Sequence, residues 1–193
     1  MTISEPMTMA TDYVLGGVAA YAAIVLFRHP QASRRLWALA FAALAAGAFL
    51  GGTWHGLVQS HLLWKATVLS VGVASFGMVA GSAYAVFSAR GRALVVTAAL
   101  AKLLVYAGWM LFHDQFIYVV IDTALAFVVV APLHLWKWNG AILAGVALSV
   151  VAGLVQASGF KPHEHFNHND LYHAIQIVAL VLLYHGAKRL QSS

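Results

Sequence analysis

Apolar runs of about 20 residues recur along this chain, and they limit its fold more than any other feature. Of its 193 residues, 62% are hydrophobic and only 9% are charged, whereas soluble domains carry about 25% charged residues. In lipid every backbone polar group needs an internal hydrogen-bond partner, so an apolar run of this length is typical of a membrane-spanning helix. The sequence therefore predicts an all-α membrane protein.

Seven such runs predict a seven-transmembrane-helix bundle that forms a single integral membrane domain over residues 1–193. The leading stretch MTISEPMTMATDY lacks the basic segment of a cleavable signal peptide, so we interpret the first run as a true span. Small residues at GxxxG spacing (Gly47 with Gly51, Gly77 with Gly81) permit close helix approach. The sequence does not determine the oligomeric state, and a homo-oligomer is possible. The expected spans are Asp12–Phe27, Leu36–Leu57, Leu63–Phe87, Ala93–Phe112, Phe116–Leu135, Trp138–Ala157 and Asp170–Ala187.

Charge is distributed unevenly between the two sides of this expected bundle. Most basic residues fall on one side, namely Arg28, Arg34, Arg35, Arg90, Arg92, Lys137, Lys188 and Arg189. The positive-inside rule then places the C-terminus in the cytoplasm and the N-terminus outside. All six acidic residues fall in the outer half. Because the basic residues form no continuous tract, nucleic acid is not expected as a partner.

Histidines gather at the outer side as well. The segment HEHFNHNDLYH (163–173) holds four histidines and two acids directly before the last apolar run. His55 lies in the last turn of the second run, in GGTWHG, and His173 lies in the first turns of the seventh. Both positions face outward in the predicted topology, so we expect the two imidazoles at similar depth. On a helix, residues three or four apart share a face, and here that polar face contains Asn169, His173, Gln176 and Tyr184.

This pattern predicts a zinc site. The chain has no cysteine, so a metal would need histidine or carboxylate ligands. Catalytic zinc typically has three protein ligands and one water molecule. We predict His55 and His173 as two ligands and leave the third open between His168 and Asp170. Asp170, three residues before His173, fits helical spacing better but is also a candidate base.

Simpler interpretations exist for the same residues. Asn167 and Asn169 are natural N-caps, so NHND also marks the start of a helix. A lone histidine within a span is commonly a hydrogen-bonded packing residue, and the loop histidines are expected to be solvated. Lys102 and Asp122 are expected to form a buried ion pair between adjacent helices. In a functional interpretation, Asp122 would instead orient a metal-bound histidine or accept a proton.

The pattern resembles the superfamily of seven-span metal-dependent hydrolases that contains alkaline ceramidases, adiponectin-receptor-like proteins and related lipid-remodelling proteins. The resemblance implies zinc held by one histidine of span two and an HxxxH pair of span seven, with a serine near the first histidine and an aspartate on span three. His55 and His173 match this pattern. The first HxxxH position falls on Asn169 with the histidine displaced to His168, the serine position falls on Gly51, and span three contains no aspartate.

The resulting hypothesis is a zinc-dependent hydrolase of lipid amide or ester bonds in the inner (plasma) membrane of a bacterium. The metal-bound hydroxide would attack the carbonyl, Asp170 or Asp122 would move the proton, and Thr53 or Tyr172 would polarise the oxyanion. Two alternatives come from other classes: a transporter of protons or metal ions along the polar face, and a membrane protein that binds haem through His55 and His173.

Overall fold

The computed structural model describes residues 4–192, which form seven α-helices joined by short turns. All seven helices are long and apolar enough to cross a membrane, which confirms the predicted all-α, seven-span architecture. They are α1 (Pro6–Phe27), α2 (Ala32–Gly56), α3 (His61–Val86), α4 (Ala89–Phe112), α5 (Ile117–Trp136), α6 (Gly140–Ser158) and α7 (His168–Ala187).

Local capping signals set several of the helix ends. The Ser60 side chain accepts a hydrogen bond from the Leu63 amide at the start of α3, and Gly159 ends α6 in the left-handed conformation, with φ of 66°. The predicted start of the first span at Asp12 was wrong, because α1 begins at Pro6. Proline suits the first helical position, and the polar turn that follows stays helical because α7 supplies its partners.

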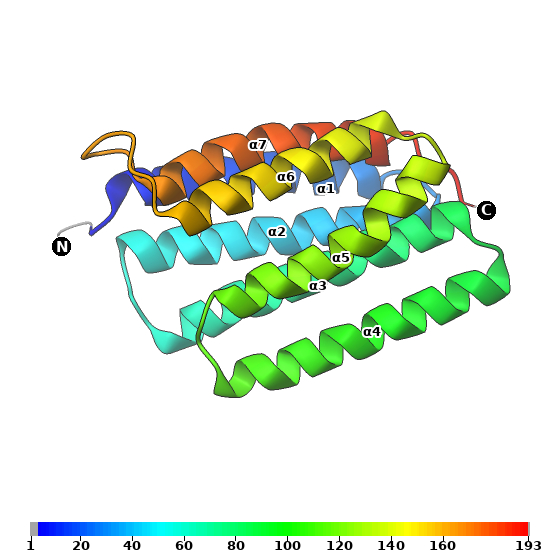
Figure 1. The fold of residues 1–193 in the computed structure, drawn as a ribbon, viewed down its shortest axis with the longest axis horizontal. Coiled ribbons are helices and arrows are strands. Elements are labelled where there is room, and N and C mark those ends of the chain that lie inside the picture. Colours follow the sequence, from blue (N-terminus) through cyan, green and yellow to red (C-terminus); the bar gives the residue numbers. More distant parts are fainter. Residues whose placement is uncertain (1–3, 193) are drawn as a thin grey trace.

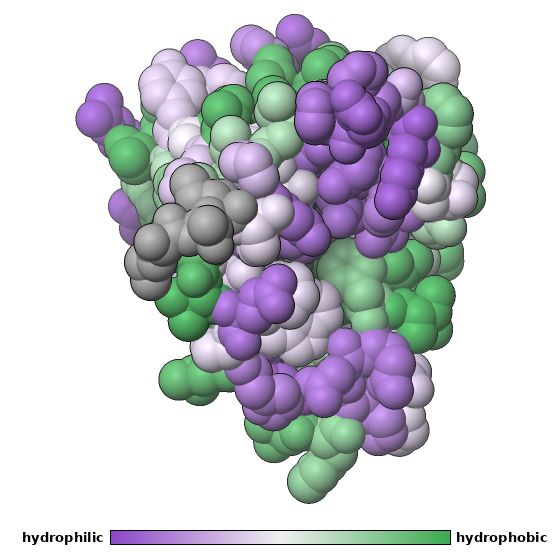
Figure 2. All heavy atoms as spheres, turned by 90° about the vertical axis from the view of Figure 1, so that its left-hand side faces the viewer, coloured by the Kyte–Doolittle hydropathy of each residue, from purple (hydrophilic) through white to green (hydrophobic). Residues whose placement is uncertain are grey.

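The helices run alternately in opposite directions, with α1 beside both α2 and α7, and α4 at the edge of the bundle (Figure 1). We call the end at which α1 and α7 begin the acidic end, because all six acidic residues lie in that half. The opposite end, where α1 and α7 finish, is the basic end. Figure 2 looks onto the acidic end, where hydrophilic residues form two separate areas rimmed by hydrophobic side chains.

The edge helix α4 exposes large apolar side chains, including Leu94, Leu104 and Phe112, which are 73%, 65% and 84% exposed. Soluble monomers rarely leave such an apolar surface uncovered. A bilayer accepts it without cost, because lipid tails are as apolar as these side chains. The exposed face of α4 therefore supports membrane embedding.

Two glycines allow α2 and α3 to approach closely. A methyl group added at Gly77 would lie 2.8 Å from the Ala40 backbone nitrogen and 2.9 Å from the Leu36 carbonyl oxygen. One added at Gly81 would lie 2.5 Å from Trp37 Cδ1. The predicted close approach at this GxxxG pair is therefore confirmed, and the neighbouring atoms at Gly77 belong to the backbone.

Replacing Gly77 with alanine is expected to destabilise the bundle by about 2 kcal/mol, because backbone atoms of α2 cannot move aside as a side chain would. Gly108→Ala on α4 is the matched control, since a methyl group there would meet no atom within 4 Å. Reversible unfolding in mixed detergent measures both variants. Equal stability of the two variants would contradict the close α2–α3 contact.

The expected ion pair between α4 and α5 is confirmed. Lys102 Nζ lies 2.5 Å from Asp122 Oδ1 and 3.0 Å from the Asp122 carbonyl oxygen. The Asp122 side chain is 3% exposed and that of Lys102 is 22% exposed. On α3, Ser75 also donates a hydrogen bond to the Asp122 carbonyl. This pair therefore links the edge helix α4 to the rest of the bundle.

Candidate functional site

A buried polar cluster lies at the acidic end, where α1 and α7 run side by side in the same direction. Thr8 Oγ1 donates a hydrogen bond to Asp170 Oδ1 at 2.8 Å, and Thr11 Oγ1 lies 3.0 Å from His173 Nδ1. Thr8 and Thr11 are three residues apart, as are Asp170 and His173, so two matching turns meet across the helix interface. His173, a member of the polar face predicted on the last span, thus turns toward α1.

His173 is the centre of this cluster because both of its ring nitrogens have partners on α1. Nε2 lies 3.2 Å from Asp12 Oδ1, and the His173 and Asp12 side chains are 8% and 7% exposed. Nδ1 faces the Thr11 hydroxyl. The imidazole therefore lies between a hydroxyl group and a carboxylate in surroundings nearly free of solvent.

The positions of hydrogen atoms in this cluster are restricted. Thr11 has one hydroxyl hydrogen, which points either to Nδ1 of His173 or to the carbonyl oxygens of Met7 and Thr8, 3.1 and 3.0 Å away. When it points to Nδ1, the neutral ring carries its hydrogen on Nε2, the nitrogen that lies 3.2 Å from Asp12 Oδ1. In that state a carboxylate orients a base whose other nitrogen faces a hydroxyl group, which is the general arrangement of an activated nucleophile.

Asp170 is held in a fixed position. Its Oδ2 accepts the Asn167 amide at 2.7 Å in a capping box, and its Oδ1 accepts the Thr8 hydroxyl. The residue is 1% exposed. Since both carboxylate oxygens already have partners, its contacts favour a positioning role over proton transfer. The helix-start interpretation of NHND is confirmed.

His55 has a separate carboxylate partner. Its Nδ1 lies 2.7 Å from Glu5 Oε2, and its ring packs edge-on against Trp54, with the ring centres 5.0 Å apart. Glu5 and Asp12 are seven residues apart, which corresponds to roughly 10 Å along a helix. His55 and His173 are therefore attached to different levels of α1 rather than to one shared partner.

His168 is one of the two candidates for the third zinc ligand. His168 begins α7, and its Nδ1 is buried without a partner among residues 4–192. Within that described range, no three histidine or acidic side chains form a group that could hold a metal ion. His55 can bind a metal through Nε2 while its Nδ1 stays paired with Glu5, but both ring nitrogens of His173 have partners on α1, so the zinc site stays a prediction.

Two predicted catalytic residues lie elsewhere in the bundle. Thr53 Oγ1 donates a hydrogen bond to the Phe49 carbonyl and lies 3.0 Å from the Tyr13 hydroxyl, on the side of α1 that faces α2. Asp122 contacts α3 and α4, as described above. Of the predicted site residues, the cluster on α1 therefore brings together only Asp170 and His173.

Sequence reasoning missed the partners on α1: Glu5, Thr8, Thr11 and Asp12. The signal was present in the sequence. TMATD places the Thr11 hydroxyl and the Asp12 carboxyl group three and four residues after Thr8, and Asp170 and His173 on α7 are likewise three residues apart. Gly51, where the resemblance expected serine, lies beside this carboxylate. A methyl group on Gly51 would stand 3.5 Å from Asp12 Oδ2, which is an ordinary van der Waals contact.

A second polar cluster at the acidic end, formed by His61, Lys65 and Asp114, connects α3 to the turn between α4 and α5. Lys65 Nζ and His61 Nε2 lie 2.7 and 3.1 Å from Asp114 Oδ1, and Lys65 also donates hydrogen bonds to the Met110 and His113 carbonyls. The hydrogen bond from Lys65 is the main cause that lowers the pKa of Asp114 below its ordinary value of 3.8. Asp114 is solvent-exposed, so this pairing acts at the surface of the bundle.

The pKa direction gives a pH prediction. A carboxylate with a lowered folded-state pKa stabilises the fold above its ordinary pKa and loses that contribution as the pH falls through the folded value. Asp114→Asn is therefore expected to lower the melting temperature at about pH 7, and the difference from the unmodified protein is expected to shrink as the pH falls below about 4. Glu164→Gln, in the exposed 159–167 loop, removes the same charge and controls for net charge. A melting-temperature gap that widens on acidification would contradict the assignment.

Sequence and structure comparisons point to one family. No curated protein and no solved structure matches the chain. One family, described as a family of unknown function (DUF6962), matches residues 7–192, which include all of the α1 and α7 residues of the cluster. Because this match covers nearly the whole sequence, the chain belongs to the DUF6962 family.

Proposed function

We propose that this protein is an integral membrane hydrolase that cleaves ester or amide bonds of lipids at its acidic end, with Thr11 as nucleophile and His173 as general base. One observation carries the proposal: Nδ1 of His173 lies 3.0 Å from the Thr11 hydroxyl while Nε2 lies 3.2 Å from Asp12. The base therefore lies between the nucleophile and the orienting carboxylate.

The chemistry follows from these three groups. His173 Nδ1 takes the hydroxyl proton as Thr11 Oγ1 forms a bond to the substrate carbonyl carbon, which yields a tetrahedral oxyanion. The Asp12 carboxylate stabilises the imidazolium through Nε2–H. His173 then returns the proton to the leaving alkoxide or amine as its bond to carbon breaks. Water, activated by the same base, releases the acid from Thr11 and restores the site.

Lipid is the expected substrate class because the cluster lies within apolar helices near one end of the bundle. A lipid can enter sideways from the bilayer, whereas a polar solute would have to cross the packed helices. Thr11 is the least buried of the three residues, so the nucleophile is the part of the site that substrate reaches first. With the topology predicted by the positive-inside rule, the site opens to the outside of the plasma membrane of a bacterium.

Lipid hydrolysis by threonine variants tests this proposal. Purified protein is incubated with a diacyl phospholipid or a ceramide, and released fatty acid is measured. Thr11→Ala is expected to lower the rate by at least about 100-fold, while Thr11→Ser retains activity within about tenfold. Thr53→Ala, at the same end of the bundle, is the matched control and keeps its rate. Unchanged turnover by Thr11→Ala overturns the assignment.

A covalent trap provides a second readout. A fluorophosphonate lipid analogue phosphonylates an activated hydroxyl oxygen and expels fluoride. We expect the label on the α1 peptide at Thr11, and we expect His173→Gln to abolish it. Labelling confined to other residues would contradict the role of Thr11 as nucleophile even if the protein proved to be a hydrolase.

Proton transfer across the membrane is a second candidate, favoured by polar pairs deeper in the bundle. Gln176 donates a hydrogen bond to Ser149 at 3.0 Å, one turn below His173, and Ser82 lies 2.9 Å from His134 near the basic end. Proteoliposomes with an internal pH-sensitive dye test it. A proton flux lost in Asp12→Asn, together with no release of fatty acid, would select transport over hydrolysis.

A further inference from the structure

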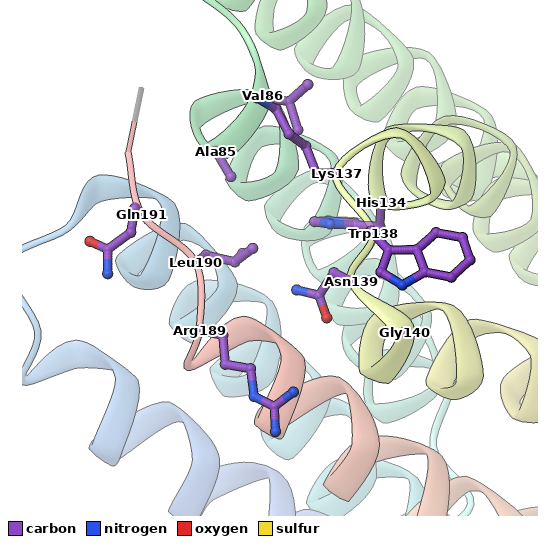
Figure 3. Close-up of a pocket in the computed structure, with 10 residues that line it drawn as sticks. All are labelled: Ala85, Val86, His134, Lys137, Trp138, Asn139, Gly140, Arg189, Leu190 and Gln191. Atoms are coloured by element: carbon purple, nitrogen blue, oxygen red, sulfur yellow. The ribbon is translucent and has the colours of Figure 1, made fainter.

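A cleft of about 290 Å³ opens at the basic end, far along the bundle from the cluster described above. It lies between the end of α3, the turn from α5 to α6, and the segment that follows α7 (Figure 3). Its lining includes His134, Lys137, Asn139, Gly140 and Arg189. In Figure 3 the His134 ring and the Asn139 side chain point toward the centre, with Lys137 and Arg189 at opposite rims.

The side chains around this cleft carry positive charge. Within residues 4–192, neither Lys137 nor Arg189 pairs with a carboxylate, and all six acidic residues lie in the opposite half of the bundle. Lys137 Nζ lies 5.5 Å from the centre of the Trp136 ring, which is 69% exposed at the expected membrane boundary. Two cations in one concave site attract an anionic group.

The cleft also holds a buried polar atom without a partner. His134 is 0% exposed, and its Nδ1 makes no hydrogen bond among residues 4–192. The Ser82 hydroxyl lies 2.7 Å from the Met78 carbonyl and 2.9 Å from His134 Nε2; when its one hydrogen points to Met78, it accepts from Nε2. In the neutral ring Nδ1 is then an acceptor, which calls for a ligand with a hydroxyl hydrogen. Buried polar atoms are rarely left unpaired in native proteins.

The walls of the cleft are fixed in place. Asn139 Nδ2 donates a hydrogen bond to the Gly186 carbonyl at 3.1 Å and so ties the start of α6 to the end of α7. Arg34 Nε donates to the Leu190 carbonyl at 2.7 Å, which anchors the segment after α7 to α2. Trp138, 81% exposed, has φ of 50°, a strained conformation that persists only where surroundings enforce it. The start of the 19-residue α6 adds backbone N–H groups beside Gly140.

We infer that this cleft binds an anionic phosphate group that carries a neighbouring hydroxyl, as in a polyol-phosphate lipid headgroup or a free phosphate monoester. Lys137, Arg189 and the start of α6 contact the phosphate oxygens, and the hydroxyl donates to His134 Nδ1. Basic pockets between spanning helices suit such headgroups. In the predicted topology this site faces the cytoplasm, so it is separate from the proposed hydrolytic site and does not depend on it.

Lipid binding to the detergent-solubilised protein tests the charge requirement. Protein in neutral detergent is titrated with mixed micelles that contain phosphatidylglycerol or phosphatidylcholine, and tryptophan fluorescence is recorded. Lys137→Gln/Arg189→Gln is expected to weaken phosphatidylglycerol binding about 30-fold, since each basic residue contributes about fivefold. Arg28→Gln/Arg90→Gln removes the same charge from the same end outside the cleft and keeps the affinity. Equal losses in the two double variants, or no preference for phosphatidylglycerol, would overturn the site.

A matched pair of lipids tests the hydroxyl requirement. Phosphatidylmethanol has the charge of phosphatidylglycerol but no headgroup hydroxyl, so it should bind at least about fivefold more weakly. His134→Phe should bind both lipids equally while keeping its preference for them over phosphatidylcholine. Competition by soluble glycerol 3-phosphate identifies a phosphate-monoester source, and its absence identifies the lipid. Equal binding of the two anionic lipids to unmodified protein would refute the role of His134.

Discussion

Replacing His173 with glutamine is expected to lower lipid hydrolysis by at least about 100-fold, because the amide can form hydrogen bonds but cannot accept the Thr11 proton. His55→Gln is the matched control. It lies at the same end of the bundle, contacts Glu5 rather than the α1 cluster, and should keep the rate within about threefold. Fatty-acid release under substrate saturation measures both variants, and circular dichroism verifies that each retains its helices.

The activities of His173→Gln and His55→Gln also distinguish a Thr11 nucleophile from a zinc centre. A zinc centre built on both histidines requires that His55→Gln and His173→Gln lose activity together, along with stoichiometric zinc measured by plasma mass spectrometry. In that case Thr11→Ala would remain active. The pattern expected here is the reverse, with Thr11 and His173 essential and His55 dispensable. An absorption spectrum of the same preparation tests the haem alternative.

Lys102→Met is expected to destabilise the protein by about 3 kcal/mol, because it leaves the Asp122 carboxylate buried without its cation. The Asp122 side chain is 3% exposed, so water cannot replace the lost partner. The double variant Lys102→Met/Asp122→Leu removes both charges and should recover most of the loss. Unfolding in mixed detergent measures the three proteins.

The stability of the double variant distinguishes the effect of an unpaired charge from the effect of lost packing. If the double variant is no more stable than Lys102→Met, the destabilisation comes from lost packing of the lysine stem and not from an unpaired charge. If Lys102→Met costs nothing, the pair is solvated within the bilayer and does not link α4 to α5 energetically.

Local sequence patterns predicted the helices well, since apolar length and capping residues act over a few neighbouring positions. The seven spans, the capping at Asn167 and the pairing of Lys102 with Asp122 all depend on spacing along one helix or on adjacent helices. The start of α1 was missed because Thr8 and Asp12 look like an exposed polar leader. Their burial depends on α7, and no local pattern reports that contact.

The site was predicted less well for the same reason. His173 was identified because its polar face on α7 is visible in the sequence, but its partner Thr11 lies 162 residues away on α1, beside its other partner Asp12. Which helices become neighbours is decided by packing of the whole bundle, including the glycine contacts of α2 with α3. The prediction therefore joined His173 to His55, a residue of similar chemistry, rather than to the hydroxyl and carboxyl groups of α1.

The pairing of α1 with α7 has a consequence for biogenesis. During synthesis α1 leaves the ribosome long before the segment that carries Asp170 and His173, so Asp12 enters the membrane before its imidazole partner exists. Until the seventh helix has been released from the translocon, the nascent chain holds an acidic side chain in the membrane without its imidazole partner, which is costly in lipid. Premature termination in the loop after α6 should therefore yield a rapidly degraded polypeptide rather than a stable six-helix fragment.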